Sequence, residues 1–287
     1  MEQYIKQILE LKDPTFQQIR KIANDRISYL SQGERDKLQD GLNRGVNLLD
    51  SNELLCQYLW AYGNMHEAKI NQAVSCVPLE VFKNNSIQII DWGCGQGLAT
   101  ICFFDYLNKN GITYNVQKVV LIEPSKAALQ RATSHVNTYL KGENKIIPIC
   151  KFIDDVEKKE IETQQPITLH FFSNILDIEN INLKYLAEKV GKAVLGQQYF
   201  FCIGPLNTWN KRIDAFYNYF NSPETFLDYE HGKVEENPTH YHKYTAKYKV
   251  FKLENNKFNL VAVDYYPPVQ FHAAYQLDCV RNAFHNL

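Results

Sequence analysis

The chain has 287 residues, of which 45% are hydrophobic and 22% charged, a balance typical of a globular protein with a sizeable core. Its formal net charge of −1 argues against a broad electrostatic footprint for nucleic acid, although it leaves room for a local basic patch. No apolar stretch reaches the roughly 20 residues that a membrane-spanning helix needs, so we expect no membrane partner.

The first 80 residues have the spacing of helices. Apolar side chains recur at i, i+3 and i+4 steps at Tyr4, Ile5, Ile8 and Leu9, and again at Leu54, Leu55, Tyr58 and Leu59. Polar breaks at 31–33 and 50–51 divide the region into several helices, and Ser51 is placed to cap the last of them. We therefore predict an N-terminal helical cap over residues 1–84.

After residue 85, short apolar strands alternate with amphipathic helices. Strands are predicted at 86–91, 118–123, 146–153, 167–173 and 198–203, and helices at 98–111, 124–142 and 183–194. This alternation predicts an α/β fold with a doubly wound, mostly parallel sheet that is covered on both faces.

The end of the chain has a different pattern. Residues 245–266 predict a hairpin that turns at 254–257, so the sheet should finish with an antiparallel strand. The prolines at 267–268 then stop the strand, and a last helix is predicted over 270–285.

The stretch DWGCGQG (91–97) follows the first predicted strand. Its three alternate glycines require either a sharp turn or the close approach of a ligand, and ligands of parallel sheets bind at the carboxyl ends of the strands. A dinucleotide fingerprint would need a glycine at Leu98, and a phosphate loop would need a lysine that is missing. Asp91 would repel a pyrophosphate but suits a ligand that carries an ammonium group.

IIDWGCGQG strongly resembles the first motif of class I S-adenosylmethionine-dependent methyltransferases. The resemblance implies a Rossmann-like domain of seven strands over residues 85–287, with S-adenosylmethionine as cofactor. It also implies that the loop approaches the methionine part of the cofactor and that the leading acid interacts with its amino group. The matching positions are Asp91, Gly93, Gly95 and Gly97, and Cys94, which lies between two of the glycines, is counted with them as a cofactor-binding residue.

A second family feature is an acid that ends the next strand and binds both ribose hydroxyls. Glu123, followed by Pro124, stands at that position, and a carboxylate with two acceptor oxygens suits a diol. A third feature, a polar residue near the adenine amine, corresponds to Asp154 or Asp155, although DDVEKKE is equally typical of a solvated charge run.

Two segments are candidates for the acceptor side. Ser173 and Asn174 follow the fourth strand, where the family places residues that line the cofactor and the acceptor; an ordinary helix cap is the alternative. Tyr62 and His66 lie on a helix just before the first strand and could form a lid, although helical packing explains the tyrosine and a satisfied core position explains the histidine. Asn174, His66 and Tyr62 are the catalytic candidates.

Other motifs have simpler interpretations. Cys94 is interpreted as a packing residue and not a nucleophile, because no histidine or lysine stands beside it in sequence. His240 and His242 lack a visible third ligand, so no metal site is predicted. The seven cysteines contain no CxxC pair and the N-terminus does not read as a signal peptide, which leads us to expect reduced thiols and a cytoplasmic location.

The function that the resemblance implies is in-line transfer of a sulfonium methyl group to a nucleophile. The near-neutral charge favours a small-molecule acceptor. Two alternatives stay open at this point: an RNA methyltransferase that uses a local basic surface, and a non-catalytic module that binds the cofactor.

Overall fold

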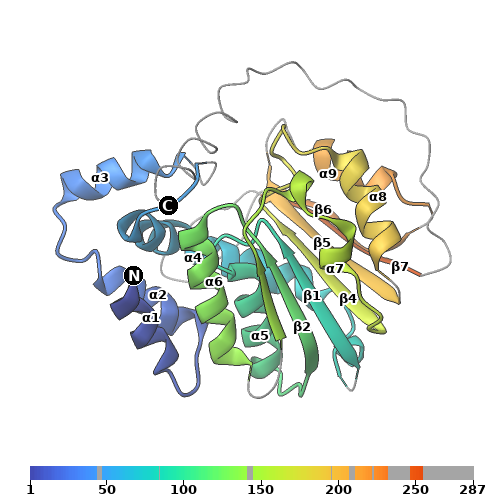
Figure 1. Cartoon of the computed structure of the whole chain (residues 1–287), viewed down its shortest axis with the longest axis horizontal. Coiled ribbons are helices and arrows are strands. Elements are labelled where there is room, and N and C mark those ends of the chain that lie inside the picture. Colours follow the sequence, from blue (N-terminus) through green and yellow to red (C-terminus); the bar gives the residue numbers. More distant parts are fainter. Residues whose placement is uncertain are drawn as a thin grey trace.

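A seven-stranded sheet lies between two groups of helices in the computed structural model (Figure 1). The structure describes residues 1–43, 47–83, 85–140, 145–194, 196–206, 211–221, 223–231 and 246–254. None of the helices in these ranges is long and apolar enough to cross a bilayer.

The sheet has the strand order β3-β2-β1-β4-β5-β7-β6. Its strands are β1 (Ser86–Trp92), β2 (Asn115–Ile122), β3 (Lys145–Ile149), β4 (Ile167–Ser173), β5 (Gln197–Pro205), β6 (Glu224–His231) and β7 (Ala246–Leu253). The strands β1 to β5 are parallel, and β7 is antiparallel to both β5 and β6. The predicted fold class, a mostly parallel seven-stranded sheet with an antiparallel end, is therefore confirmed.

Two details of the strand prediction differ from the structure. The third strand ends at Ile149 and not at residue 153, because β2, its neighbour in the sheet, ends in register with it at Ile122. The segment 224–231 forms β6, where no strand was predicted. The second arm of the predicted hairpin, the two prolines and the helix over 270–285 lie outside the described residues.

The order in which the chain adds strands to the sheet switches sides at β1 and β4. It builds β1, β2 and β3 outward to one edge, then returns to place β4 on the other side of β1. Asp91 near the end of β1 therefore has Leu121 of β2 on one side and Phe171 of β4 on the other. Such a switch point opens a crevice at the carboxyl ends of the strands, which is where ligands bind in this class of sheet.

Four helices precede the sheet: α1 (Glu2–Leu9), α2 (Phe16–Asp25), α3 (Gln32–Gly41) and α4 (Asn52–Ser75). Ser51 caps α4 by accepting a hydrogen bond from the backbone N–H of Leu54, as predicted. The break predicted at 31–33 is limited to Ser31, which caps the N-terminus of α3. Ser31 and Glu34 form a capping box, and residues 32 and 33 already belong to the helix.

The remaining helices cover both faces of the sheet. They are α5 (Leu98–Lys109), α6 (Lys126–Tyr139), α7 (Lys158–Ile161), α8 (Leu183–Ala193) and α9 (Lys211–Asn218). One core cluster joins the sheet to α1, α2, α4, α5 and α6, and a second joins the opposite face to α7, α8 and α9. Tyr4 and Phe16, from the N-terminal helices, are buried in the first cluster together with side chains of the sheet. The boundary at residue 84 between a helical cap and a Rossmann-like domain stays a prediction.

Candidate functional site

The glycine loop connects β1 to α5 through three left-handed residues. Gly93, Gly95 and Gly97 have φ values of +62°, +52° and +77°. A Cβ on Gly93 would lie 2.6 Å from Ile175 Cδ1, and one on Gly97 would lie 3.3 Å from Ala132. A Cβ on Gly95 would meet no heavy atom within 4 Å. Two of the glycines therefore allow close packing, while Gly95 faces open space in which a ligand could touch the backbone.

Glu123 joins this loop to the end of β2. Its Oε2 accepts a hydrogen bond from the backbone N–H of Gly95 at 3.0 Å, and its Oε1 accepts one from Ser125 N–H at 2.9 Å. The backbone N–H of Cys94 bonds to the carbonyl of Ile122 at 2.9 Å. Burial raises the pKa of Glu123 to about 7, although both backbone hydrogen bonds oppose the shift.

Asp91 lies directly before the loop with 2% of its surface exposed. Its Oδ2 accepts a hydrogen bond from the Thr100 hydroxyl at 2.7 Å. Burial raises the pKa of Asp91 to about 7, and the nearby charge of Glu123 raises it further. The raised pKa values mean that the ionised forms of Asp91 and Glu123 are unfavourable in the free protein. A cationic ligand beside them would stabilise these ionised forms.

The helix α4 reaches the carboxyl end of β4 through His66. The amide nitrogen of Asn174 lies 3.0 Å from His66 Nδ1, and the Tyr58 hydroxyl lies 2.9 Å from His66 Nε2. Because an amide nitrogen can only donate, Nδ1 is the acceptor and Nε2 carries the proton that bonds to Tyr58. Burial lowers the pKa of His66 to about 3, so this imidazole is neutral and both of its nitrogens are engaged.

Asn174 itself has an unusual backbone. Its φ of 55° lies in the left-handed region, and its N–H bonds to the carbonyl of Ile203 in β5 at 2.7 Å. Its side-chain nitrogen also lies 3.3 Å from the Ser173 hydroxyl. The structure thus brings Ser173, Asn174 and His66 together at the end of β4.

Tyr62 is directed toward α3. Its hydroxyl accepts a hydrogen bond from Gln39 at 2.9 Å, and its ring packs edge to face on Tyr58 with centroids 5.3 Å apart. Of the two tyrosines on this part of α4, Tyr58 is the one that bonds to His66. Sequence spacing alone could not separate them, because both lie on neighbouring turns of one helix.

The two aspartates after β3 have different environments. Asp154 accepts hydrogen bonds from the backbone N–H of Asn182 at 3.1 and 3.3 Å, so its carboxylate holds the segment before α8. Asp155 is exposed. At the end of β3, Cys150 donates to the carbonyl of Pro124 at 3.4 Å, which keeps the residue after Glu123 beside this segment.

Cys94 is buried, and burial raises the pKa of its thiol well above the ordinary value. A thiol in this state is a poor nucleophile, which agrees with its interpretation as a packing residue. No group of three metal-ligating side chains occurs in the described ranges. His240 and His242 lie outside them.

A buried network holds the loop from behind, and the sequence gives no signal for it. Gln96 donates to the carbonyl of Leu55 at 2.9 Å and accepts from Arg131 at 3.1 Å, while its own carbonyl lies 2.8 Å from His135 Nδ1. The Tyr4 hydroxyl bonds to the other nitrogen of His135 at 2.9 Å, and the Arg131 guanidinium lies 3.9 Å above the Tyr4 ring. The helices α1, α4 and α6 therefore all contribute to the position of the loop.

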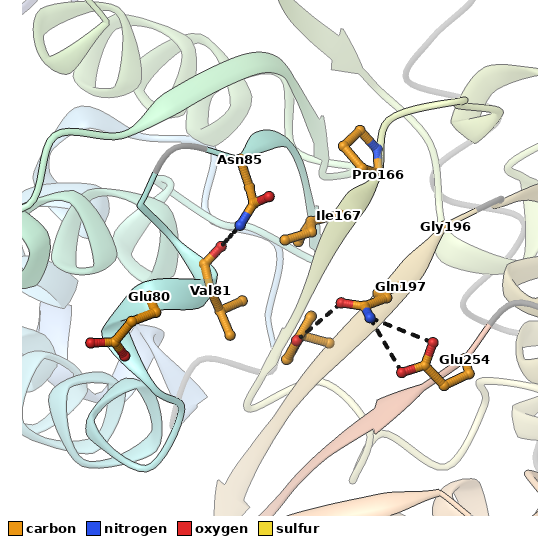
Figure 2. Close-up of a pocket in the computed structure, with 9 residues that line it drawn as sticks. Glu80, Val81, Asn85, Pro166, Ile167, Gly196, Gln197 and Glu254 are labelled. Carbon is orange, nitrogen blue, oxygen red and sulfur yellow. Dashed lines mark hydrogen bonds between the residues drawn. The ribbon is translucent and has the colours of Figure 1, made fainter.

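A cavity of about 620 Å³ lies at the opposite end of the strands (Figure 2). It is lined by Pro166 and Ile167 at the start of β4 and by Gly196 and Gln197 at the start of β5. Gln197 donates to the carboxylate of Glu254 and so has a partner within the chain. Because ligands of parallel sheets bind at the carboxyl ends, the glycine loop and not this cavity is the candidate site.

Comparison with known proteins gives matches among solved structures only. No model of a known protein family and no curated protein matches the chain. The N-methyltransferase NodS from Bradyrhizobium japonicum matches with a TM-score of 0.44 and 8% identity, over 68% of this chain and 98% of that one. M. capricolum TrmK in complex with S-adenosyl-homocysteine matches with a TM-score of 0.38 and 13% identity, over 66% and 69%. The plantazolicin methyltransferase BpumL, also in complex with SAH, matches with a TM-score of 0.33 and 13% identity, over 70% and 63%.

Identities of this size bear on the fold alone. The chain's own architecture is more informative: the strand order, the reversal between β1 and β4, and the glycine loop at the end of β1. With these features the chain has the Rossmann-like α/β fold that its resemblance to class I S-adenosylmethionine-dependent methyltransferases implied.

Proposed function

We propose that this chain binds S-adenosylmethionine at the carboxyl ends of β1 and β2 and transfers its methyl group to a small-molecule acceptor. The observation that carries the proposal is the pairing of Gly95 with Glu123. Gly95 offers bare backbone beside open space, and the carboxylate bonded to its N–H belongs to the residue proposed to bind the ribose. A loop that served only as a turn would have no need of a buried carboxylate at this point.

The donor groups around the loop fit this cofactor. The backbone of residues 93–97 would contact the methionine part, with Asp91 directed toward the ammonium group. Glu123 would bind the ribose hydroxyls, because each of its oxygens keeps a lone pair after accepting one backbone hydrogen bond. Either Asp154 or Asp155 would lie near the adenine. When bound, the cofactor supplies an electrophilic methyl group on a positively charged sulfur.

The contribution of the chain to the reaction would then be alignment and the exclusion of water. Asn174 is held by two elements at once, through its backbone to β5 and through its side chain to His66 of α4. Asn174 therefore has a polar side chain that is held from two sides at the end of β4. We propose that it positions the acceptor, with His66 fixing its orientation.

Calorimetric titration with S-adenosylhomocysteine tests the proposal. Binding should stabilise the protein against unfolding by about 2.7 kcal/mol at a ligand concentration of one hundred times the Kd. Purified protein is then incubated with S-adenosylmethionine and either the small-molecule or the RNA fraction of a cell extract. Product in the small-molecule arm alone supports the proposal, product in the RNA arm alone favours an RNA acceptor, and the absence of binding at millimolar ligand refutes it.

Replacing Glu123 by alanine should weaken cofactor binding by roughly 1.5–3 kcal/mol, the range for hydrogen bonds to a charged group. The expected result is a Kd for S-adenosylhomocysteine that rises about 10-fold to 150-fold in calorimetry. The control is Glu188→Ala, since Glu188 lies on α8 and pairs with Lys192 at 3.7 Å. Unchanged affinity in a folded Glu123→Ala protein would show that the ribose is held elsewhere.

Cofactor affinity should also depend on pH. The pKa values of Asp91 and Glu123 are both raised to about 7, so in the free protein these groups are largely protonated below pH 7. A cationic ligand favours the ionised forms, so affinity should rise between pH 6 and pH 8 by about tenfold for each carboxyl group. The stability of the free protein should change with pH in the opposite direction. The folded state binds these protons more tightly than the unfolded state, so their contribution to the free energy of unfolding is lost as the pH rises through 7.

The measurement is a series of titrations from pH 6 to pH 8. Glu123→Gln should remove about one factor of ten from the pH dependence, because only Asp91 then titrates. A flat profile in the unaltered protein would contradict the proposed ammonium contact.

A further inference from the structure

His135 is a buried histidine on α6, and both of its ring nitrogens make hydrogen bonds. Its Nδ1 lies 2.8 Å from the carbonyl oxygen of Gln96, and its Nε2 lies 2.9 Å from the hydroxyl oxygen of Tyr4. A carbonyl oxygen can only accept, so Nδ1 carries the proton. Burial lowers the pKa of His135 to about 3, so the ring is neutral and Nε2 accepts its bond from Tyr4. The hydrogen bonds therefore run in one direction, from the Tyr4 hydroxyl through the imidazole to the Gln96 carbonyl.

The Gln96 carbonyl belongs to the glycine loop, and its peptide group is held at both ends. The carbonyl accepts from His135, and the N–H of Gly97 in the same peptide group donates to the carbonyl of Cys94 at 2.7 Å. Gly97 has a φ of +77° and no Cβ, so this peptide group could otherwise rotate at little steric cost. Rotation would turn the Gln96 carbonyl away from His135 and break both bonds. His135 therefore fixes the backbone of the loop that we propose to contact the cofactor.

The hydroxyl that begins this series of bonds lies on α1, a helix of eight residues. Helices of this length are unstable in water by themselves, so α1 depends on its packing against the rest of the chain. Tyr4 and Ile8 are its buried residues, and the Tyr4 ring packs edge to face on the His135 ring with centroids 5.7 Å apart. The residue that docks α1 on α6 is therefore also the residue that bonds to His135.

The loop should be held more firmly when α1 is docked than when it is displaced. In the docked state the Tyr4 hydroxyl saturates Nε2 and its ring covers the imidazole, so the bond from Nδ1 to Gln96 is buried. Hydrogen bonds in series strengthen one another, and the exclusion of water strengthens each of them. A displaced α1 would leave Nε2 open to water and the imidazole held from one side only. A ligand that needs the fixed loop must then favour the docked state.

We propose, building on the function proposed above, that Tyr4 is a positioning residue of the cofactor site. It acts through His135: the hydroxyl orients the imidazole, and the imidazole holds the peptide group between Gln96 and Gly97 in the conformation that binds the cofactor. The docking of α1 and the binding of the cofactor are therefore coupled, and each favours the other by the same factor.

The first test replaces Tyr4 by phenylalanine, which removes the hydroxyl and keeps the ring that packs on the Arg131 guanidinium. We expect the Kd for S-adenosylhomocysteine, measured by calorimetry, to rise at least about fivefold, the lower end of the usual range for coupled sites. The matched control is Tyr248→Phe. Tyr248 is equally buried on β7, and its hydroxyl has no hydrogen-bond partner among the described residues, so the Kd should not change.

NMR of protein with isotope-labelled histidine tests whether Tyr4 acts through His135. The unaltered protein should carry the His135 proton on Nδ1, with an N–H signal that exchanges slowly with water. In Tyr4→Phe this proton should exchange faster than in Tyr248→Phe, because the imidazole is no longer held at Nε2. Equal exchange in the two variants would show that the hydroxyl does not act through the imidazole.

Hydrogen exchange of the unaltered protein tests the reciprocal effect. Saturating S-adenosylhomocysteine should slow the exchange of the backbone amides of residues 5–9 in α1 by about the factor by which Tyr4→Phe raises the Kd. The same ligand should have little effect on these amides in Tyr4→Phe, because the coupling has been removed.

Three further results would overturn the inference: an unchanged Kd in folded Tyr4→Phe, a rise of equal size in Tyr248→Phe, or amides of α1 that do not respond to the ligand in the unaltered protein. If Tyr4→Phe does not fold, the exchange experiment on the unaltered protein decides by itself. Titration of the unaltered protein separates the two proposals: no binding refutes the proposed function, whereas binding that does not depend on Tyr4 overturns only this inference.

Discussion

Replacing Gly95 by valine is expected to weaken cofactor binding strongly while the protein still folds. Gly95 has a φ of +52°, and a Cβ there would enter open space without meeting a heavy atom within 4 Å. The backbone strain of a left-handed residue should cost about 1–2 kcal/mol of stability. The side chain would fill the space proposed for the methionine part of the cofactor, so we expect the Kd for S-adenosylhomocysteine to rise by roughly 100-fold or more, about 2.7 kcal/mol.

Two other glycines provide controls for this variant. A Cβ at Gly93 would lie 2.6 Å from Ile175, so Gly93→Ala should lower stability by about 1–3 kcal/mol through overpacking. Gly33 lies on α3 with nothing within 4 Å, and Gly33→Val should leave affinity unchanged. Thermal unfolding measures the loss of stability that backbone strain or overpacking causes, and calorimetry measures the loss of affinity that a blocked cofactor site causes. Normal affinity in Gly95→Val would refute the assignment of the cofactor to this loop.

Replacing Arg131 by methionine is expected to lower the free energy of unfolding by roughly 3–5 kcal/mol, a larger loss than either glycine substitution in the loop should cause. The fully buried guanidinium lies 3.9 Å above the Tyr4 ring and donates to Gln96 and Asn52. A desolvated cation–π contact contributes about 2 kcal/mol, and acceptors left unpaired by the substitution cost about 1–3 kcal/mol. The free energy of unfolding, measured with urea, tests the value.

The same variant should weaken cofactor binding, because Gln96 would lose one of the partners that hold the loop. The matched control is Arg35→Met, where a less buried guanidinium lies 5.2 Å from the Trp60 ring and donates to the Ile27 carbonyl. We expect less than about 1 kcal/mol of destabilisation there and no change in affinity. Equal losses in the two variants would show that the network behind the loop has no special contribution.

Local pattern was sufficient for most of the sheet and for the position of the glycine loop. Apolar runs such as SIQIID and KVVLIE can only be buried strands when helices alternate with them, and β1 and β2 lie where these runs predict. Ser51 was equally predictable as a helix cap, because capping depends on atoms within a few residues. The strand β6 escaped prediction because ETFLDYEH lacks a continuous apolar run, and pairing with β7 forms it.

The candidate site also has some features that follow from local sequence and others that depend on tertiary packing. The amino-acid sequence by itself determined the left-handed loop at 93–97 and the acids before and after it, because glycine conformations and strand ends are local properties. Only the tertiary structure decided that Tyr4 lies beside His135 and that Asn174 bonds to His66. Such pairs join residues more than one hundred positions apart, and the packing of α4 and α1 against the sheet brings them together, which periodicity cannot encode.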